Sequence, residues 1–497
     1  MLTFLLTTLP LLLAPTAAQA TGEIRPEAFG AIAGDGIPDN AAVQAAFAVG
    51  GALGSDVVLG GLYEIQSRAN QTNLGNPWRT FAVHVTGNVR PVLIRAENGG
   101  GLTAVGDWFG SAGYLLTVYK NGAPVTFRDI YLDMSQRCAG IDENAQNCRD
   151  EQQHAMELDL GAQHVRLEDV TIYHPSLGVS AGGDCVRMVG GYTDADLVRD
   201  IYIRGLVGIS CDRSLLSFQR SVHQVTAEHL TSFYAEDNDI DMEATGTDPN
   251  DELTWIQDVT IRSALVVKNG GNGITLGRGI RIRVIDSAVI GGAVFALSCR
   301  DCLIAGSTFM QAPTSVDAPI GVIRASERVK ILNNRIGRLA GSTTTSPLVY
   351  VAANNGSSPR DTLIQGNDLA VTYNAPALRA DNAEVTVALN TFRFTGALPT
   401  NQNAVAAVFQ SLQGGPPVST LVTGNRFLGA WQVAAQVSGT ATWPVGSVVV
   451  TSNVFDGART ALRCVNWALA FPTFPVRTGN WKNSAALDDC PIATTGY

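Results

Sequence analysis

The sequence predicts an all-β fold: a single-stranded, right-handed parallel β-helix, or solenoid, with a short N-terminal capping helix. Three observations predict it. A triplet with apolar residues at alternate positions, followed by a turn residue, recurs along the middle and end of the chain. A second set of short strands can be aligned residue by residue, and a helical pattern precedes both sets.

The repeat is clearest where its turn residue is Asn. The positions are Asn367, Asn390, Asn425, Asn453 and Asn480, so the steps are 23, 35, 28 and 27 residues. Such steps suit one coil of a solenoid, in which equivalent strands pair in parallel ~4.8 Å apart. A recurrent Asn at one turn predicts a ladder of amide hydrogen bonds. The alternative, a β-sandwich, would need regularly spaced hairpin dipeptides such as Asn-Gly, and these are sparse.

The second set of strands is defined by apolar residues at its third and fifth positions. The aligned segments are 154–158, 184–188, 214–218, 238–242 and 272–276. Because side chains alternate along a strand, the third and fifth residues are predicted to point into the coil and the second and fourth outward. This register predicts that Asp239 and Asp241 lie on the outer face.

The segment before the coils predicts a capping helix. Val43 and Phe47 lie four residues apart in the Ala-rich run 40–47, and Asp39 is the predicted N-cap. A helix is expected there because the end of a solenoid is an open sheet edge. The predicted organisation is a signal peptide at 1–20, an N-terminal segment with the capping helix at 21–56, and the β-helix with a C-terminal tail at 57–497.

The charge and the N-terminus indicate where the protein acts. The formal net charge is -10 and no block of Lys or Arg is present, which argues against nucleic acid and anionic membranes as partners. The apolar run 2–13 and the small-residue site 18–20 predict an export signal, with an N-terminal membrane anchor as the alternative. No later segment is apolar for long enough to span a membrane. We therefore expect a secreted or periplasmic protein. The sequence does not indicate its oligomeric state.

Eight cysteines in an exported chain are expected to be fully oxidised. The expected pairs are Cys138–Cys148, which bracket a polar loop, and Cys464–Cys490, which tie the C-terminal tail. The other four are expected to pair among themselves in an order left open: Cys185, Cys211, Cys299 and Cys302. The Cys-x-x-Cys spacing of the last two lacks a second such motif or a nearby His, so no zinc site is predicted.

The chemistry is predicted at the acidic segment 236–243. Asp237, Asp239, Asp241 and Glu243 share one parity, so all four are expected on one face, with neighbours ~6.6–7 Å apart. That spacing suits two carboxylates that hold a water between them, as in an inverting glycoside hydrolase. Crowding also raises the pKa of one carboxyl, which makes it a usable acid. A plain polar surface and a Ca²⁺ site remain alternatives, and no other cofactor or metal is predicted.

Asp184, one strand set earlier, is the fourth predicted catalytic residue beside Asp237, Asp239 and Asp241. Its register points it toward the coil corner, so a structural role is an equal alternative. The predicted substrate-binding residues, several of which suit a uronate carboxylate, are Glu243, Arg187, Lys268, Arg278 and Arg281. Arg187 stands one coil from Glu157 in the same outward column, where a surface ion pair is the default interpretation. The histidines have no metal-ligand spacing.

Two segments carry a resemblance to a known superfamily. Residues 29–44, Phe-Gly-Ala-Ile-Ala-Gly-Asp-Gly-Ile-Pro-Asp-Asn-Ala-Ala-Val-Gln, are followed by Val-Val-Leu-Gly-Gly-Leu-Tyr at 57–63. Together they resemble the opening segment of the pectate-lyase-like β-helix superfamily. The resemblance implies the fold; superfamily members include hydrolases, lyases, epimerases and phage tailspikes, so it does not imply one chemistry.

A weaker similarity to polygalacturonase-type hydrolases covers four short motifs. The segments of this chain that correspond to them are Gly183-Asp184, Asp237-Asn238, Gly271-Asn272-Gly273 and Arg281-Ile282-Arg283. Two positions depart from that family, because Asn238 and Asn272 replace an Asp and a His. The sequence therefore predicts a secreted polysaccharide-degrading enzyme, with hydrolysis by paired carboxylates preferred. The alternatives are a lyase acting on a uronate-containing polysaccharide, with or without Ca²⁺, and a non-catalytic glycan-binding solenoid.

Overall fold

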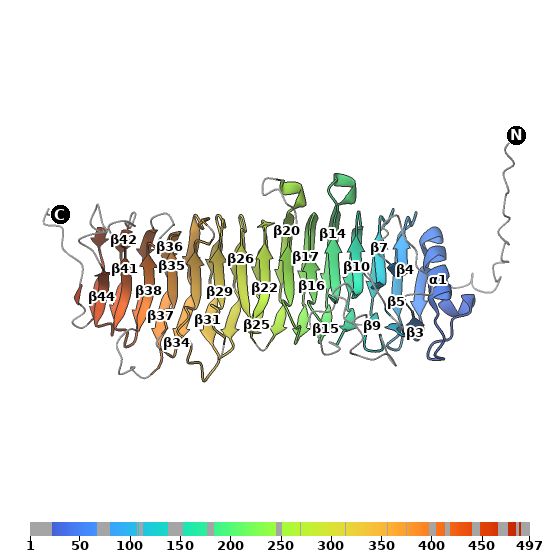
Figure 1. Cartoon of the computed structure of the whole chain (residues 1–497), viewed down its shortest axis with the longest axis horizontal. Coiled ribbons are helices and arrows are strands. Elements are labelled where there is room, and N and C mark those ends of the chain that lie inside the picture. The colour runs from blue at the N-terminus through green and yellow to red at the C-terminus, as the bar shows by residue number, and fades with distance from the viewer. Residues whose placement is uncertain are drawn as a thin grey trace.

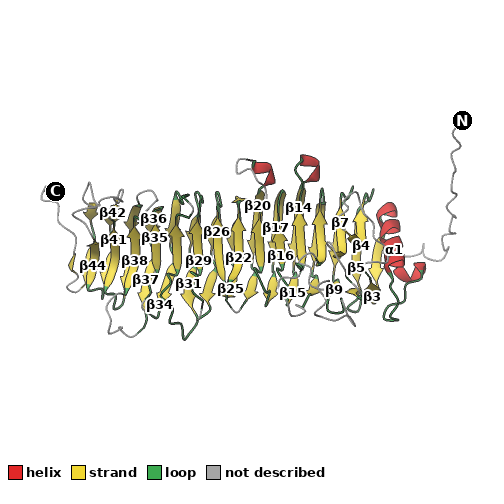
Figure 2. Ribbon diagram, in the orientation of Figure 1, coloured by secondary structure: helices red, strands yellow, loops and turns green. Residues whose placement is uncertain are grey.

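A stack of coils, each built from short strands, forms one elongated body (Figure 1). The computed structural model describes residues 22–66, 80–106, 108, 113–137, 153–175, 183–244, 251–268, 270–313, 315–354, 356–373, 375–396, 404–412, 418–439, 448–465, 476–483 and 487–488. The expected signal peptide at 1–20 lies outside these residues. In the described part of the chain, strands of successive coils pair in parallel and form three sheets (Figure 2).

Sheet A has 17 strands among the described residues. They are β1 (Glu23–Ile24), β2 (Asp56–Leu59), β5 (Val92–Ala96), β8 (Val125–Arg128), β11 (Gln163–Glu168), β14 (Val198–Arg204), β17 (Val222–Glu228), β20 (Ile256–Arg262), β23 (Gly279–Ile280), β24 (Arg283–Ile285), β27 (Leu303–Ala305), β30 (Lys330–Leu332), β33 (Thr362–Gln365), β36 (Glu384–Ala388), β39 (Ser419–Thr423), β42 (Val448–Thr451) and β45 (Val476–Thr478).

Sheet B consists of short strands that follow those of sheet A across a tight turn. They are β3 (Leu62–Ile65), β6 (Gly101–Ala104), β9 (Tyr131–Asp133), β12 (Thr171–Tyr173), β15 (Val207–Ile209), β18 (Thr231–Phe233), β21 (Leu265–Val267), β25 (Ala288–Gly291), β28 (Thr308–Gln311), β31 (Arg335–Arg338), β34 (Asp368–Val371), β37 (Thr391–Phe394), β40 (Arg426–Leu428), β43 (Val454–Asp456) and β46 (Trp481–Asn483). The sequence predicted two columns of strands; this third one is too short for alternation to mark it.

Sheet C contains the second predicted set of strands. Its members are β4 (Thr80–Thr86), β7 (Gly113–Tyr119), β10 (His154–Asp159), β13 (Val186–Val189), β16 (Leu216–Phe218), β19 (Ile240–Glu243), β22 (Asn272–Gly277), β26 (Ala293–Leu297), β29 (Ile320–Ile323), β32 (Val349–Ala352), β35 (Leu378–Asp381), β38 (Val405–Gln410), β41 (Val433–Ser438), β44 (Thr460–Val465) and β47 (Leu487–Asp488). The predicted register is confirmed, because Met156, Val186, Leu216, Ile240 and Ile274 pair in sequence across neighbouring strands.

The N-terminal end of the stack is covered by helix α1 (Asn40–Leu53), as predicted (Figure 1). The described residues also form the 3-10 turns η2 (Pro26–Phe29), η4 (Asp194–Asp196) and η5 (Glu252–Thr254). Val43 and Phe47 are buried in the core. Asp39 is the N-cap residue, but its side chain makes no capping bond; Oδ1 instead accepts a hydrogen bond from Ile32 N at 3.1 Å. The carboxylate therefore fixes the preceding loop rather than the helix end.

The Asn ladder is confirmed in the turn between sheets A and B. Asn367 donates from Nδ2 to Asn390 Oδ1 at 2.9 Å, and Asn390 donates to Asn425 at 3.0 Å. The ladder continues through Asn453 to Asn480. Each amide also donates to a backbone carbonyl of the previous coil, as Asn390 does to Ile364 O at 2.8 Å. The ladder satisfies polar groups that the turn would otherwise bury unpaired.

The cysteines that the structure describes are all oxidised. Disulfides join Cys185 to Cys211 and Cys299 to Cys302, which resolves the pairing left open. Cys464 is also disulfide-bonded. Cys138, Cys148 and Cys490 lie outside the described residues. Among the helices described, none is long and apolar enough to cross a membrane.

These features establish the predicted fold class. The chain is a right-handed parallel β-helix, in the hand that parallel crossover connections adopt almost without exception, with an N-terminal capping helix. One continuous apolar core runs along its axis. The outer face of sheet C is where polar side chains gather, and it carries the site described next.

Candidate functional site

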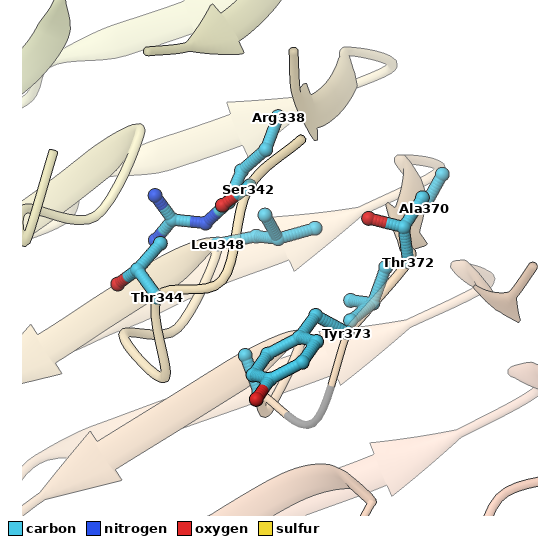
Figure 3. Close-up of a pocket in the computed structure, with 9 residues that line it drawn as sticks. Arg338, Ser342, Thr344, Leu348, Ala370, Thr372 and Tyr373 are labelled. Atoms are coloured by element: carbon cyan, nitrogen blue, oxygen red, sulfur yellow. The ribbon is translucent and has the colours of Figure 1, made fainter. Parts of the chain in front are cut away.

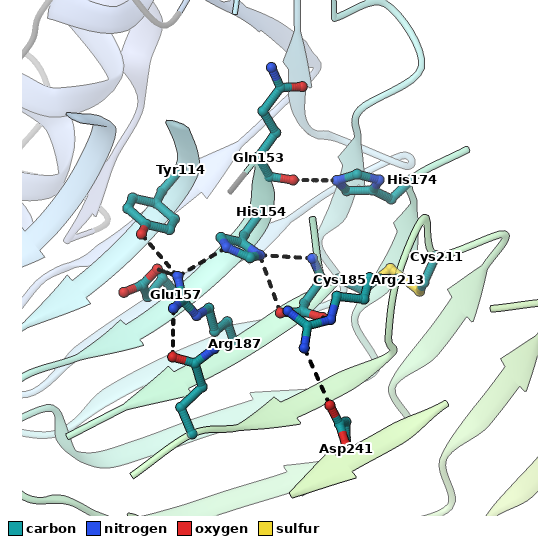
Figure 4. Close-up of polar contacts among 12 residues, drawn as sticks. Tyr114, Gln153, His154, Glu157, His174, Cys185, Arg187, Cys211, Arg213 and Asp241 are labelled. Carbon is teal, nitrogen blue, oxygen red and sulfur yellow. Dashed lines mark hydrogen bonds and ion pairs between the residues drawn. A yellow bond between two sulfur atoms is a disulfide. The ribbon is translucent and has the colours of Figure 1, made fainter. Parts of the chain in front are cut away.

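A cluster of charged side chains lies on the outer face of sheet C, over β10, β13, β16 and β19 (Figure 4). Its axis is the fourth-position column, in which Glu157 pairs with Arg187, Arg187 with Ser217, and Ser217 with Asp241. All four of these residues are buried although they point away from the core. The cluster is therefore shielded from bulk water, which strengthens every charge interaction within it.

Arg213 lies at the centre of the acidic half of this cluster. Its Nη2 lies 3.4 Å from Asp241 Oδ2 and 3.0 Å from Glu243 Oε2. Its Nε lies 3.9 Å from Asp184 Oδ1 and 3.8 Å from Asp237 Oδ2. The Asp184 and Asp241 side chains are essentially inaccessible, whereas those of Asp237 and Glu243 are 54% and 48% exposed. The guanidinium of Arg213 thus contacts two buried carboxyl groups and two exposed ones, and the exposed pair forms the rim of the cluster.

Burial changes the acidity of both inner carboxyls. It raises the pKa of Asp241 to about 7, helped by the negative charge of Glu243 and opposed by Arg213. Burial likewise raises the pKa of Asp184 to about 6, against the effect of Arg213 and Arg187. For Arg213, burial acts to lower the pKa, but Asp184, Glu243 and their neighbours more than offset it and the pKa is raised. Near neutral pH the cluster therefore contains a carboxylic acid able to donate a proton beside a fixed positive charge.

Arg187 organises the other half of the cluster. Its Nη1 lies 3.2 Å from Tyr114 Oη, 3.1 Å from His154 Nε2 and 3.8 Å from Glu157 Oε2. Its Nη2 donates to Gln219 Oε1 at 2.6 Å. His154 in turn accepts a hydrogen bond at Nδ1 from Asp184 N at 2.7 Å. The Arg187–Glu157 pair exists, but the expectation of a surface pair is wrong, because both side chains are buried.

Two serines complete the buried part of the cluster. Ser214 and Ser217 form hydrogen bonds with the Asp184 carboxylate, which act to lower its pKa. Asp241 Oδ1 is buried and has no hydrogen bond among the described residues. Leaving such an atom unpaired costs about 1–3 kcal/mol, and a hydroxyl group of a bound ligand would satisfy it.

Asp239 does not join the cluster, which corrects the prediction that it faces outward. Its side chain is fully buried, and its Oδ1 accepts a hydrogen bond from Ser232 Oγ of sheet B at 2.5 Å. The equivalent residues Ala155, Cys185 and Leu215 are all in the core. The chain turns a corner just before sheet C, so the second and third positions both point inward and strict alternation fails there.

Lys268 accompanies Asp239 on the inner side of this corner. Its Nζ lies 3.9 Å from Asp239 Oδ2 and donates to Ala235 O at 3.0 Å. Arg278 donates to Ala244 O at 3.2 Å, at the edge of the acidic cluster. Arg281 lies on sheet A, where Nε and Nη2 bind Asp258 at 2.6 and 2.7 Å. Of the predicted binding residues, Glu243 and Arg187 belong to the cluster, whereas Lys268 and Arg281 contact Asp239 and Asp258 outside it.

The acidic residues were also considered as a Ca²⁺ site, but their side chains are arranged differently from a metal site. Within the described part of the chain, no three His, Cys, Asp or Glu side chains are grouped so that they could hold a metal ion. Asp184, Asp237, Asp241 and Glu243 converge on the guanidinium of Arg213 instead.

Sequence reasoning missed Arg213, and also Tyr114 and His154 as members of a site. A signal for Arg213 was present in the alignment of strands. Extending it by one residue at the N-terminal end places Arg213 between Gly183 and Asp237, and the structure joins them by hydrogen bonds between Arg213 N and Gly183 O and between Asp237 N and Arg213 O. Tyr114 gave no such signal, because β7 lay outside the aligned strands.

No family model and no curated protein sequence matches the chain. Among solved structures it is similar to the A-module of a mannuronan C-5 epimerase from Azotobacter vinelandii, with 14% identity, 93% of this chain and 100% of that chain covered, and a TM-score of 0.49. It is also similar to the catalytic unit of a GH87 α-1,3-glucanase from Streptomyces thermodiastaticus (14% identity, 95% and 71% covered, TM-score 0.41). A third is a tailspike protein of the Acinetobacter baumannii bacteriophage Fri1, a capsular polysaccharide depolymerase (11% identity, 77% and 65% covered, TM-score 0.46). At these identities the likeness is one of fold.

Proposed function

We propose that the protein hydrolyses glycosidic bonds in a polysaccharide, with Asp241 as the proton donor. The observation that supports this most is the state of Asp241: a buried carboxyl with a pKa of about 7, held at 3.4 Å by Arg213 among further carboxylates. Cleavage of a glycosidic bond needs an acid that still holds its proton near neutral pH. Its buried Oδ1 atom has no hydrogen bond among the described residues and suits a hydroxyl group of a sugar ligand.

The second group required is a carboxylate that activates water, and Asp237 fits that role. It is open to solvent at the rim, with 54% of its side chain exposed. Asp237 and Asp241 both contact the guanidinium of Arg213, so their carboxylates lie within about 10 Å, compatible with the ~6.5–9.5 Å of an inverting pair. Glu243 keeps Asp241 protonated through its charge, and Asp184 fixes Arg213 from the buried side.

The lyase alternative has less support from these side chains. Elimination needs an Arg or Lys that gives up its proton and then takes one from the sugar. The pKa of Arg213 is raised by its carboxylate neighbours, so it stays charged. The pKa of Lys268 is lowered by burial, but its ammonium group lies on the inner side of the corner against Asp239.

The test is a screen of the purified full-length protein on neutral and acidic polysaccharides. New reducing ends without ultraviolet absorbance from an unsaturated uronate support hydrolysis. Reducing ends with that absorbance favour the lyase. Binding with neither signal favours the non-catalytic solenoid.

The proposed place of action is outside the cytoplasm. The disulfides Cys185–Cys211 and Cys299–Cys302 support it, since such bonds persist in oxidising compartments.

A further inference from the structure

A groove of about 250 Å³ lies on the outer face of sheet C, on the C-terminal side of the acidic cluster. Phe295 and Tyr350 line it and are both partly exposed, and Arg379 stands at its far side with 39% of its side chain accessible. Its volume is slightly below the ~300–1,000 Å³ usual for small-molecule sites, and so suits one or two sugar rings.

The groove belongs to the same residue column as Asp241. The register runs from Asp241 through Thr275, Phe295, Gly321 and Tyr350 to Arg379, one strand at a time. At ~4.8 Å per strand, Phe295 lies ~10 Å from Asp241 along the axis, Tyr350 ~19 Å and Arg379 ~24 Å. A polysaccharide that follows the axis from Asp241 therefore reaches the groove after a few sugar units.

The aromatic floor of the groove is held in place by the backbone below it. The ring of Phe295 lies across Gly321, where a Cβ atom would come within 2.3 Å of Phe295 Cδ1. Tyr350 donates from its hydroxyl to Asp381 Oδ2 at 3.0 Å. Two fixed aromatic side chains of this kind stack on the apolar face of a sugar ring at little entropic cost.

The walls of the groove are joined by Arg338, which is half-buried. Arg338 donates from Nη2 to the carbonyls of Asp317, Ser346 and Pro347 at 3.2, 3.0 and 3.3 Å, and these residues also line the groove. Figure 3 shows Arg338 beside Ser342 and Thr344 in an adjoining cavity of about 10 Å³, which has room for no more than one water. The sugar-sized space is therefore the groove in front of Tyr350.

The charges of the groove favour an uncharged sugar. The Nε atom of Arg379 donates to both carboxylate oxygens of Asp381, at 3.0 and 2.9 Å, which neutralises the guanidinium charge. The guanidinium of Arg379 also lies over the ring of Tyr350, 5.8 Å from the ring centroid. The Asp317 carboxylate adds an acceptor and a negative charge, which the nearby guanidinium of Arg338 balances. A uronate would meet no net positive charge here, whereas sugar hydroxyls would find both donors and acceptors.

We infer that this groove is a second saccharide-binding subsite, which holds an uncharged segment of the same polysaccharide that Asp241 cleaves. The inference rests on the proposed function for its catalytic part, but it also names the substrate class: a neutral polysaccharide long enough to span the distance from Asp241 to Tyr350.

The test measures binding separately from cleavage. Full-length protein carrying Asp241→Asn is examined by affinity electrophoresis in gels that contain dextran, laminarin, xylan or galactomannan, and in gels that contain alginate or polygalacturonate. At least one neutral polymer is expected to retard it more than either acidic one. Tyr350→Ala removes one aromatic ring of the groove, and Gly321→Val displaces the other, Phe295. Each variant should weaken that binding about five- to tenfold. Trp481→Ala, an exposed aromatic in sheet B, is the matched control and should change nothing.

With Asp241 intact, the same groove variants should raise KM for the polymer and leave kcat and the cleavage of di- to tetrasaccharides unchanged. Tighter binding to the acidic polymers, binding to none of the neutral ones, or unchanged affinity in both groove variants would overturn the subsite. Groove-dependent binding without any cleavage would leave the subsite standing and reject the hydrolase. Cleavage of the polymer that the groove variants do not affect would reject the subsite and leave the proposed hydrolase standing.

Discussion

The carboxylates of Asp239 and Asp241, two residues apart in the chain, lie on opposite sides of the wall of the β-helix. Asp239 accepts a hydrogen bond from Ser232 inside the coil, and Asp241 contacts Arg213 on the outer face. Both have a pKa raised by burial, to about 6 and about 7. Their environments nevertheless differ: Asp241 lies beside the exposed carboxylates of the rim, through Arg213, and Asp239 lies inside the coil.

The pH dependence of turnover should report the protonation of Asp241. A donor with a pKa of about 7 is active while protonated, so kcat/KM should fall above pH ~7, by about tenfold per pH unit. Measuring kcat/KM between pH 4 and 9 checks this. A rate that stays constant up to pH 9 would exclude Asp241 as the acid.

Replacing Arg213 with Met should disturb both acidity and stability. Arg213 lowers the pKa of Asp184 and Asp241, so its loss should move the alkaline limb of the pH profile to higher pH. Removing one partner of a buried ion pair should also cost about 3 kcal/mol in the free energy of unfolding. Arg281→Met is the control, because its exposed pair with Asp258 is worth only ~0–1 kcal/mol. Equal destabilisation by the two variants would contradict the central position given to Arg213.

Asp239 should make the protein less stable as the pH rises. Its pKa is about 6 in the folded chain and ~3.9 in an unfolded one, so the folded state binds more protons between these values. Its contribution to stability is therefore complete below pH ~4 and is lost as the pH rises through ~6. Between pH 4 and 7 the free energy of unfolding should fall less in Asp239→Asn than in the wild type. The difference between the two should be on the order of 2 kcal/mol. Asp258→Asn should show the opposite sign, since Arg281 lowers the pKa of Asp258; denaturant titrations at pH 4 and 7 compare them.

The Asn ladder should contribute strongly to stability. Asn390 makes amide hydrogen bonds to Asn367, Asn425 and Ile364 O, and its loss leaves buried partners unsatisfied at about 1–3 kcal/mol each. Asn390→Ala should therefore lower the free energy of unfolding by about 3 kcal/mol or more, measured by denaturant titration. Its neighbour Leu389 is 61% exposed, and Leu389→Ala should have almost no effect. Similar small effects of both changes would mean that the ladder contributes little to the stability of the fold.

The sequence predicted most of the architecture because repetition made its periodicity visible. The Asn ladder, the capping helix and the register of β10, β13, β16, β19 and β22 all followed from residue spacing. Sheet B did not, because a strand of three residues such as β12 carries a single inward side chain, Ile172, which shows no alternation.

The site was predicted in part, for a reason that is also geometric. Alternation places Asp237, Asp239, Asp241 and Glu243 on one face, but it holds only within a straight strand. The corner before Ile240 sends Asp239 inward and leaves Arg213, of the same parity as buried Leu215, outside. Side-chain direction at a coil corner depends on the backbone turn, which residue types alone do not determine.

The central claim is that Asp241, and not Asp239, carries the chemistry. The most direct measurement compares turnover of the best polysaccharide substrate by Asp241→Asn and Asp239→Asn, with circular dichroism and melting temperature as checks on folding. Loss of a catalytic acid lowers kcat by ~10²–10⁴-fold, so Asp241→Asn should lose at least about a hundredfold while Asp239→Asn stays within about threefold of the wild type. Near-normal turnover by a folded Asp241→Asn variant, or an equal loss in both, would contradict the account.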